Sequence, residues 1–403
     1  MQHASQDLDA LRQRVRQFVE QQVLPNELAL GACDEAATAL TRALQQRARA
    51  AGIFGNFYPL ADGGRVASLR DYLPIAAEEG RSEFAPAILG GDATLDAYML
   101  GQHARGALRE RFFVPLVRGE ALPCYAMSEP DSIGSIPATL ASRARWQGDH
   151  WRLNGRKWFI CRAGRADFAT VIARTADGAL DGALTMLVVP REASGFEFVR
   201  PLALLGRQQG QGELRFDDVR IEPWQVLGRP GQGLALMQQR LGLGRLLRAA
   251  HWLGLAQRCF DLLCARVHSA RGQQARLADK QLLRARVYRV YRDIAAARGL
   301  LHDAADGFDR GEHDAIAVNL AKLAASDALS GAVDSAVQVM GAEGLSELSP
   351  LSGIYRQART THILDGTDDA LISTIGRDLL KASAPGAPSH LPGLAPTLDE
   401  ALA

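Results

Sequence analysis

The chain has 403 residues, 47% of them hydrophobic and 23% charged, as in globular proteins and unlike disordered or collagen-like chains. Its 46 basic and 45 acidic residues leave a net charge of +1, which disfavours nucleic acid as a partner. The longest apolar run, Ala183 to Pro190, is too short to cross a bilayer, so we expect no membrane span. Five scattered cysteines and an N-terminal segment unlike a signal peptide predict a cytoplasmic protein.

The hydrophobic pattern divides the chain into helical, β and helical parts. In residues 1–121, apolar residues recur at three- and four-residue steps, which predicts a helical domain. Residues 122–228 contain short β-branched and aromatic runs separated by turn pairs, which predict a β domain. Residues 229–382 return to long helical patterns, and the Pro- and Ala-rich residues 383–403 predict a mobile tail. Segregated helices and strands predict the α+β class.

Motifs of several common sites are absent from the sequence. It contains no GxGxxG, no P-loop, no HExxH and no GxSxG, and Gly242-Leu-Gly244 lies inside a helical pattern. The histidines and cysteines show no metal-ligand spacing, so we expect no metal site. A Rossmann-type nucleotide site is therefore disfavoured.

Two segments of the β part combine hydroxyl, thiol and aromatic side chains. The first is Tyr125-Ala-Met-Ser-Glu-Pro130, followed by the loop Asp131-Ser-Ile-Gly-Ser135. The second is Asn154-Gly-Arg-Lys-Trp-Phe-Ile-Cys161, in which strand alternation places Phe159 and Cys161 on one face. Taken alone, the Trp-Phe-Ile run is typical of a buried strand.

Three segments of the C-terminal part carry glycine or acidic residues at close spacing. Arg245 ends the sequence Arg-Leu-Gly-Leu-Gly-Arg within a helical pattern. Gln338-Val-Met-Gly-Ala-Glu-Gly344 predicts a break in the helical pattern, and its glycines would let backbone approach closely. Ile363-Leu-Asp-Gly-Thr-Asp-Asp369 places Asp365 before a glycine.

These motifs together resemble those of the acyl-CoA dehydrogenase family, over about residues 8 to 381. The resemblance implies an N-terminal helical domain, a middle domain like a β-barrel or sandwich, and a C-terminal four-helix bundle. It also implies FAD as cofactor, an acyl-CoA or acyl-carrier thioester as substrate, and an electron-transfer flavoprotein as electron acceptor. The implied assembly is a homodimer or a dimer of dimers.

The resemblance also implies which residues form the site. The implied cofactor contacts are Tyr125, Met127, Ser128, Ser135, Phe159, Cys161, Arg271, Gln281, Gln338, Gly341, Thr367 and Asp369. The implied substrate contacts are Ser135, Arg245, Leu364 and Gly366. Ala270 stands where the family has an arginine that reaches the partner's flavin, and Arg271 follows one residue later.

Asp365 stands where most of the family has a glutamate base, so the resemblance assigns it to removal of the thioester's α proton. Some subfamilies place the base beside Arg245, but Gly244 offers no carboxylate there. The closest resemblance is to the branch that uses Asp. Two alternatives stay open: a flavin oxidase of the nitroalkane type, and a non-catalytic homologue that binds FAD weakly, suggested by Cys161, Ala270 and Ala342.

Overall fold

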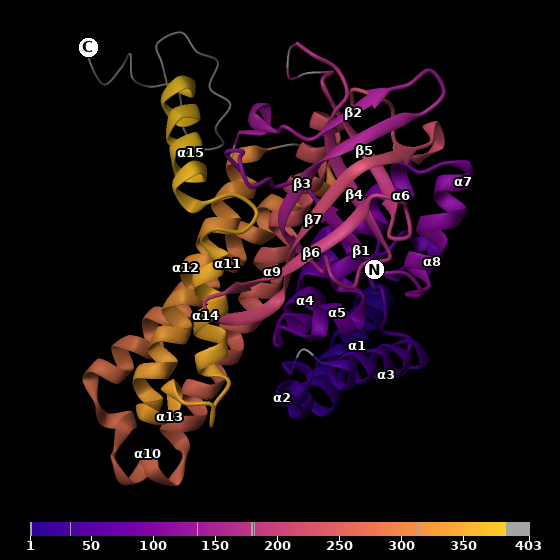
Figure 1. Ribbon diagram of the computed structural model, residues 1–403. Helices are drawn as coiled ribbons and strands as arrows, with labels where there is room; N and C mark the ends of the chain where they lie inside the picture. The colour runs from indigo at the N-terminus through magenta and orange to yellow at the C-terminus, as the bar shows by residue number, and fades with distance from the viewer. Residues whose placement is uncertain are drawn as a thin grey trace, which may run out of the picture.

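The computed structural model describes residues 2–32, 34–134, 136–178, 180, 182–312 and 314–383, with side chains from residue 7. Ser135 and nearly all of the predicted tail, residues 384–403, lie outside the described residues. Helices come first, a sheet follows, and long helices complete the chain, which confirms the predicted α+β class. In Figure 1 the sheet lies above the N-terminal helices and beside one end of the long C-terminal bundle.

The N-terminal part is helical, as the three- and four-residue periodicity predicts. Asp34 and Ser68 cap two of its helices by accepting hydrogen bonds from the backbone N–H groups of Ala37 and Asp71. The helices are α1 Gln2–Phe18, α2 Glu27–Leu30, α3 Glu35–Ala50, α4 Leu69–Glu79, α5 Ala85–Leu89, α6 Thr94–His103, α7 Gly106–Leu108 and α8 Val114–Val117.

The middle part is an eight-stranded sheet in the order β6-β7-β3-β2-β4-β5-β8, with β1 pairing parallel to β4. Every residue of β5 is buried, which explains why all of its residues except Thr185 are apolar, whereas β6 alternates between half-buried and exposed residues at the sheet edge. The strands are β1 Pro123–Ala126, β2 Arg143–Trp146, β3 Trp151–Cys161, β4 Phe168–Arg174, β5 Leu184–Pro190, β6 Phe196–Leu204, β7 Arg207–Ile221 and β8 Val226–Leu227.

An irregularity in β3 separates its structural residues from its predicted flavin contacts. The register against β7 shifts between Lys157 and Ile160, and Phe159 has a φ of 52°. Lys157 and Ile160 are buried, whereas the two residues between them are not. Trp158 and Phe159 therefore form the bulge, and the ladder with β7 resumes at Ile160, so the strict alternation that we predicted does not extend through Phe159.

The C-terminal part is a bundle in which α12 packs against α9, α11 and α14. By length and composition α12 could cross a membrane, but half of its most apolar window is buried inside the protein, as in the core helix of a bundle. The helices are α9 Gly233–His268, α10 Ala270–Gln274, α11 Gln281–Asp309, α12 Ala315–Met340, α13 Ala342–Leu345, α14 Leu351–Thr361 and α15 Asp368–Ala382.

A buried ammonium ties the segment after β1 to the sheet. Lys157 Nζ donates to the carbonyl oxygens of Met127 at 2.9 Å and Ile172 at 2.7 Å, and to Glu129 Oε1 at 2.7 Å. Its three donors are therefore all used, as burial of a charge requires. This arrangement fixes residues 127 to 129 against β3 and β4.

Glu129 and Lys157 are both buried, with side-chain exposures of 5% and 0%. Burial lowers the pKa of the Lys157 ammonium to about 8, although the carboxylate opposes that shift. Burial alone would raise the pKa of Glu129, but Lys157 and the backbone N–H groups of Ala141 and Ser142 hold it below its usual value. Both groups are therefore charged at neutral pH.

Lys157→Met should destabilise the protein by about 3 to 5 kcal/mol, because it leaves the buried Glu129 carboxylate without its cation. Arg310→Met is the matched control, since Arg310 pairs with Glu312 at the surface, where water and salt screen such pairs and they contribute little. Urea unfolding followed by circular dichroism measures both changes. Equal, small effects of the two substitutions would show that the buried pair does not hold the sheet together.

Candidate active site

The loop that carries Asp365 is tied together at its two ends. It runs from His362, after α14, to Asp368, at the start of α15. The backbone N–H of Asp368 donates to the His362 carbonyl at 3.0 Å, and His362 Nδ1 lies 2.6 Å from Asp368 Oδ2. The hydroxyl of Ser330 on α12 lies 2.7 Å from His362 Nε2. These contacts close the loop and fasten it to the bundle.

Two cations hold the middle of the loop. Lys322 Nζ, which is fully buried on α12, donates to the Gly366 carbonyl at 3.1 Å. Arg245 Nε donates to the Asp365 carbonyl at 2.8 Å, while Arg245 Nη1 donates to Asn319 Oδ1 at 2.9 Å. We predicted Arg245 as a substrate contact, and the geometry gives its guanidinium the task of holding the backbone of Asp365.

The turn at residues 365 and 366 is left-handed. Asp365 has a φ of 56° and Gly366 a φ of 105°, a region that glycine adopts freely and that Asp tolerates better than most residues. A Cβ at Gly366 would lie 3.2 Å from both Arg245 Nη2 and Leu371 Cδ2. The turn leaves the Asp365 side chain 24% exposed, so its carboxylate is accessible to a ligand.

The other predicted residues of this loop lie beside Asp365. Leu364 packs against the bundle core. Thr367 is the N-cap residue of α15, yet its side chain makes no capping hydrogen bond. Asp369 is exposed in the first turn of the same helix, where a negative charge is favourable. The structure therefore brings together all the predicted residues from 364 to 369.

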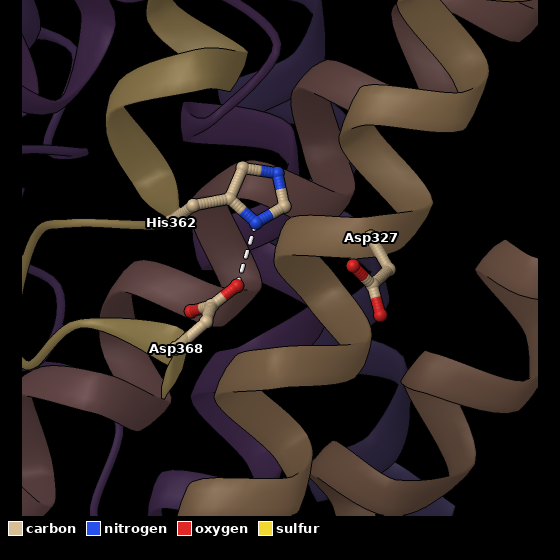
Figure 2. A group of neighbouring side chains, drawn as sticks. All are labelled: Asp327, His362 and Asp368. Carbon is tan, nitrogen blue, oxygen red and sulfur yellow. Dashed lines mark hydrogen bonds and ion pairs between the residues drawn. The ribbon is translucent and has the colours of Figure 1, made fainter. Parts of the chain in front are cut away.

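Asp327, His362 and Asp368 offer ligand atoms within 4.8 Å of one another, and Figure 2 shows Asp327 on α12 beside the bonded His362–Asp368 pair. However, Asp368 also pairs through its other oxygen with the buried ammonium of Lys322. A metal ion bound there would face that positive charge. We therefore interpret the group as the fastening of the loop.

The predicted contacts in β1 and just after it lie on a segment that the sheet holds in place. The Tyr125 ring packs under the guanidinium of Arg240, with 4.1 Å between the guanidinium carbon and the ring centroid. The Met127 carbonyl accepts from Lys157, and the Ser128 carbonyl accepts from the Trp158 N–H at 3.0 Å. The Ser128 hydroxyl makes no hydrogen bond within the described part of the chain.

Phe159 and Cys161 stand at the end of β3. The Phe159 ring is 42% exposed and packs against Trp158, with 4.9 Å between ring centroids. Cys161 Sγ accepts a weak hydrogen bond from Gln211 Nε2 at 3.8 Å. An exposed aromatic ring beside an accessible thiol leaves room for a planar ligand on this strand.

Arg248 lies where the three parts of the chain meet, and the sequence analysis missed it. Its Nε is 3.5 Å from Asp365 Oδ2. Burial by itself would lower the pKa of Arg248, but the negative charges of Asp365, Asp92 and Asp96 outweigh burial and raise it, with Cys161 also within electrostatic reach. The sequence feature that could have pointed to Arg248 is its position one helical turn after Arg245.

Asp96, in α6, is a second feature that sequence reasoning missed. Its buried carboxylate pairs with Arg162 at 3.2 Å and Arg240 at 3.1 Å, one after β3 and the other on α9. Arg162 also donates to the Asp92 carbonyl at 2.7 Å. These bonds place Asp92 and α6 beside the end of β3.

A second set of predicted cofactor contacts lies elsewhere in the chain. Gln338 and Gly341 are at the end of α12, Gln281 begins α11, and Arg271 lies on α10. In Figure 1, α10 and α13 stand at the end of the bundle far from the sheet. Arg271 is 73% exposed and pairs with Glu343 at 3.1 Å. One chain does not bring this set to Asp365.

Domain models of acyl-CoA dehydrogenases match almost the whole chain: the N-terminal domain over residues 5–120, the middle domain over 124–219 and the C-terminal domain over 231–380. Glutaryl-CoA dehydrogenase of Desulfococcus multivorans is 31% identical over 70% of this chain and 73% of that protein. Acyl-CoA dehydrogenase family member 11 of Pongo abelii is 28% identical over 92% of this chain and 50% of that protein. A solved glutaryl-coenzyme A dehydrogenase complex with glutaryl-CoA has a TM-score of 0.83 at 28% identity, covering 93% of this chain and 95% of that chain.

The chain belongs to the acyl-CoA dehydrogenase family. It spans about half the length of the first curated relatives that it matches. Membership of this family supports FAD as the cofactor.

The predicted contacts around β1 and β3 and in the loop of Asp365 fit such a cofactor. The Phe159 ring is exposed, and the hydroxyls of Ser128 and Thr367 make no hydrogen bond within the described ranges. Ser132, in the loop after β1, has a buried hydroxyl oxygen that finds no partner among the residues that the structure describes. A ligand with a flat ring system, polar ring edges and phosphates could bind to these groups.

Gly366→Ala should destabilise the protein by about 1 to 3 kcal/mol, because alanine is strained in the left-handed region and its methyl group would crowd Arg245. Gly376→Ala is the control, since the added carbon meets nothing within 4 Å in α15 and alanine favours a helix. Urea unfolding of the two variants measures the difference. Equal stabilities would mean that the turn at Asp365 is not fixed.

Proposed function

We propose that the chain is an FAD-dependent acyl-CoA dehydrogenase that forms an α,β double bond in an acyl thioester, with Asp365 as the base. The observation that carries this proposal is the accessible Asp365 carboxylate, held in a left-handed turn whose backbone is bonded to Arg245. Lys322 supports the same turn from the bundle. A base needs this fixed placement, because its carboxylate must lie within hydrogen-bonding distance of the one proton that it removes.

The α hydrogen of a thioester is weakly acidic, so the negative charge that develops on the carbonyl oxygen needs a donor. The backbone N–H of Asp365 makes no hydrogen bond within the described residues, so it is free to donate to that oxygen. One such donor contributes roughly 2.7 to 4 kcal/mol in a water-excluded site. The carboxylate accepts the α proton and becomes a neutral acid.

Bound FAD supplies the acceptor for the hydride that leaves the β carbon. On this chain, Ser128, Phe159, Cys161 and Thr367 are the residues we assign to holding it. This assignment is supported because these residues combine an exposed ring with hydroxyl and thiol groups, and because they stand at the positions of the family's flavin contacts. The thiol of Cys161 is a weaker donor than a hydroxyl.

We propose that the second set of contacts serves the flavin of another copy, in a homodimer or a dimer of dimers. Arg271 is exposed at the end of the bundle, where it is available to a neighbouring molecule. An apolar groove between α9 and α11 lies near this end, and Tyr288 and Tyr291 on its rim are 63% and 65% exposed. A second copy would remove that apolar surface from water.

We also propose that the electron acceptor is an electron-transfer flavoprotein and that the protein is cytoplasmic. The alternative of a nitroalkane-type oxidase predicts rapid oxygen consumption with substrate, whereas a dehydrogenase reduces its flavin and reacts slowly with oxygen. The alternative of a non-catalytic homologue predicts a preparation that takes up little FAD.

Asp365→Asn should slow reduction of the bound flavin by roughly 10²-fold or more, because an amide cannot accept the α proton. Asn tolerates the left-handed turn, so FAD and thioester binding should persist. Anaerobic stopped-flow mixing with acyl-CoA thioesters measures the rate.

Asp92→Asn is the matched control, because Asp92 is a second carboxylate near Arg248 that we do not assign to proton transfer. It should change the reduction rate less than threefold. If Asp92→Asn stops reduction and Asp365→Asn does not, the assignment of the base is wrong.

Arg271→Ala should weaken FAD retention by about 10- to 100-fold, the scale of a charge-assisted hydrogen bond. Arg276→Ala, which removes another exposed arginine paired at 2.8 Å with Asp279, should leave retention unchanged. Equilibrium dialysis of the dimeric protein measures both. Equal retention in the two variants would remove Arg271 from the flavin site.

A further inference from the structure

Arg248 is a charged group at the place where the proposed reaction needs an acyl chain. It follows Arg245 by one turn of α9, so both side chains leave the same side of the helix toward the loop of Asp365. Its side chain is 39% exposed, and Cys161, on the proposed flavin strand, is within electrostatic reach. Arg248 therefore faces the proposed base and is also within electrostatic reach of the strand to which we assign the flavin.

The guanidinium of Arg248 has unused hydrogen-bonding capacity. Its contact with Asp365 is 3.5 Å long, beyond the roughly 2.7 to 2.9 Å of a charge-assisted hydrogen bond. It makes no hydrogen bond within the described part of the chain. Asp96, which also faces it, is already paired with Arg162 and Arg240. The five N–H donors of Arg248 thus share a single distant ion pair, the one with Asp365.

An uncharged acyl chain would leave this guanidinium poorly matched. Such a chain would displace water from Arg248 without supplying an acceptor, which is unfavourable for a charged group. Proton transfer to Asp365 would then neutralise its nearest anion. A substrate with its own negative charge would avoid both costs, because that charge stays in place throughout the reaction.

We propose that Arg248 binds a carboxylate carried by the acyl chain, so that the preferred substrates are short dicarboxylic acyl thioesters. This inference rests on the proposed function. In the free protein Arg248 pairs loosely with Asp365. The substrate carboxylate takes over Arg248 through a bidentate contact, which frees Asp365 to accept the α proton.

The test uses the full-length, FAD-loaded protein with matched CoA thioesters: succinyl, glutaryl and adipyl against butyryl, valeryl and hexanoyl. Wild type should reduce its flavin with higher kcat/KM on the dicarboxylic series, by about 10- to 100-fold. Arg248→Met replaces the guanidinium with an uncharged side chain of similar length. It should abolish or reverse this preference, mainly through KM. Arg298→Met, which removes an exposed charge from α11, should leave it unchanged.

A wild type without preference for the dicarboxylic series would overturn the proposal, and so would an Arg248→Met variant that loses activity on both series equally. The second would mean that Arg248 only positions Asp365. Calorimetric binding of the same thioesters separates this inference from the proposed reaction. If no thioester reduces the flavin, the proposed reaction is wrong, and equal dissociation constants for the two series in wild type would also overturn the role of Arg248.

Discussion

Two fully buried ammonium groups hold the two sides of the candidate site, and the rest of its geometry depends on them. Lys157 binds the segment after β1 to the sheet, and Lys322 binds the loop after α14 to α12. A buried charge is tolerated only when its donors are satisfied. Each lysine therefore requires particular oxygen atoms at particular positions, which fixes the backbone on both sides.

The choice between lysine and arginine follows from this geometry. Only four of the 46 basic residues are lysines, and two of these four, Lys157 and Lys322, are the buried ammonium groups. An ammonium is compact and can face oxygens that converge from several directions, whereas the flat guanidinium of Arg245 reaches two acceptors on different edges of its plane. Arg248, whose fork faces only a distant carboxylate, is the exception that our proposal for the acyl chain addresses.

The fold class and the segments that form the site could be predicted from sequence, because periodicity and motifs are local in the chain. The contacts that position those segments could not. Arg245 and Asp365 are 120 residues apart, and Lys157 reaches Ile172 on another strand. The bulge at Trp158 and Phe159 also escaped the alternation rule, because it depends on pairing with β7. Arg248 looked like an ordinary helical arginine until the fold placed it beside Asp365.

The most direct test of the central claim is a crystal structure of the FAD-loaded protein with a bound thioester analogue that cannot be oxidised. The account predicts that an oxygen of Asp365 lies about 3 to 3.5 Å from the α carbon, with the turn at Gly366 unchanged. It also predicts that the thioester carbonyl oxygen accepts from the backbone N–H of Asp365. A thioester whose α carbon faces Asp92, or lies beyond the reach of any carboxylate on the loop, would contradict it.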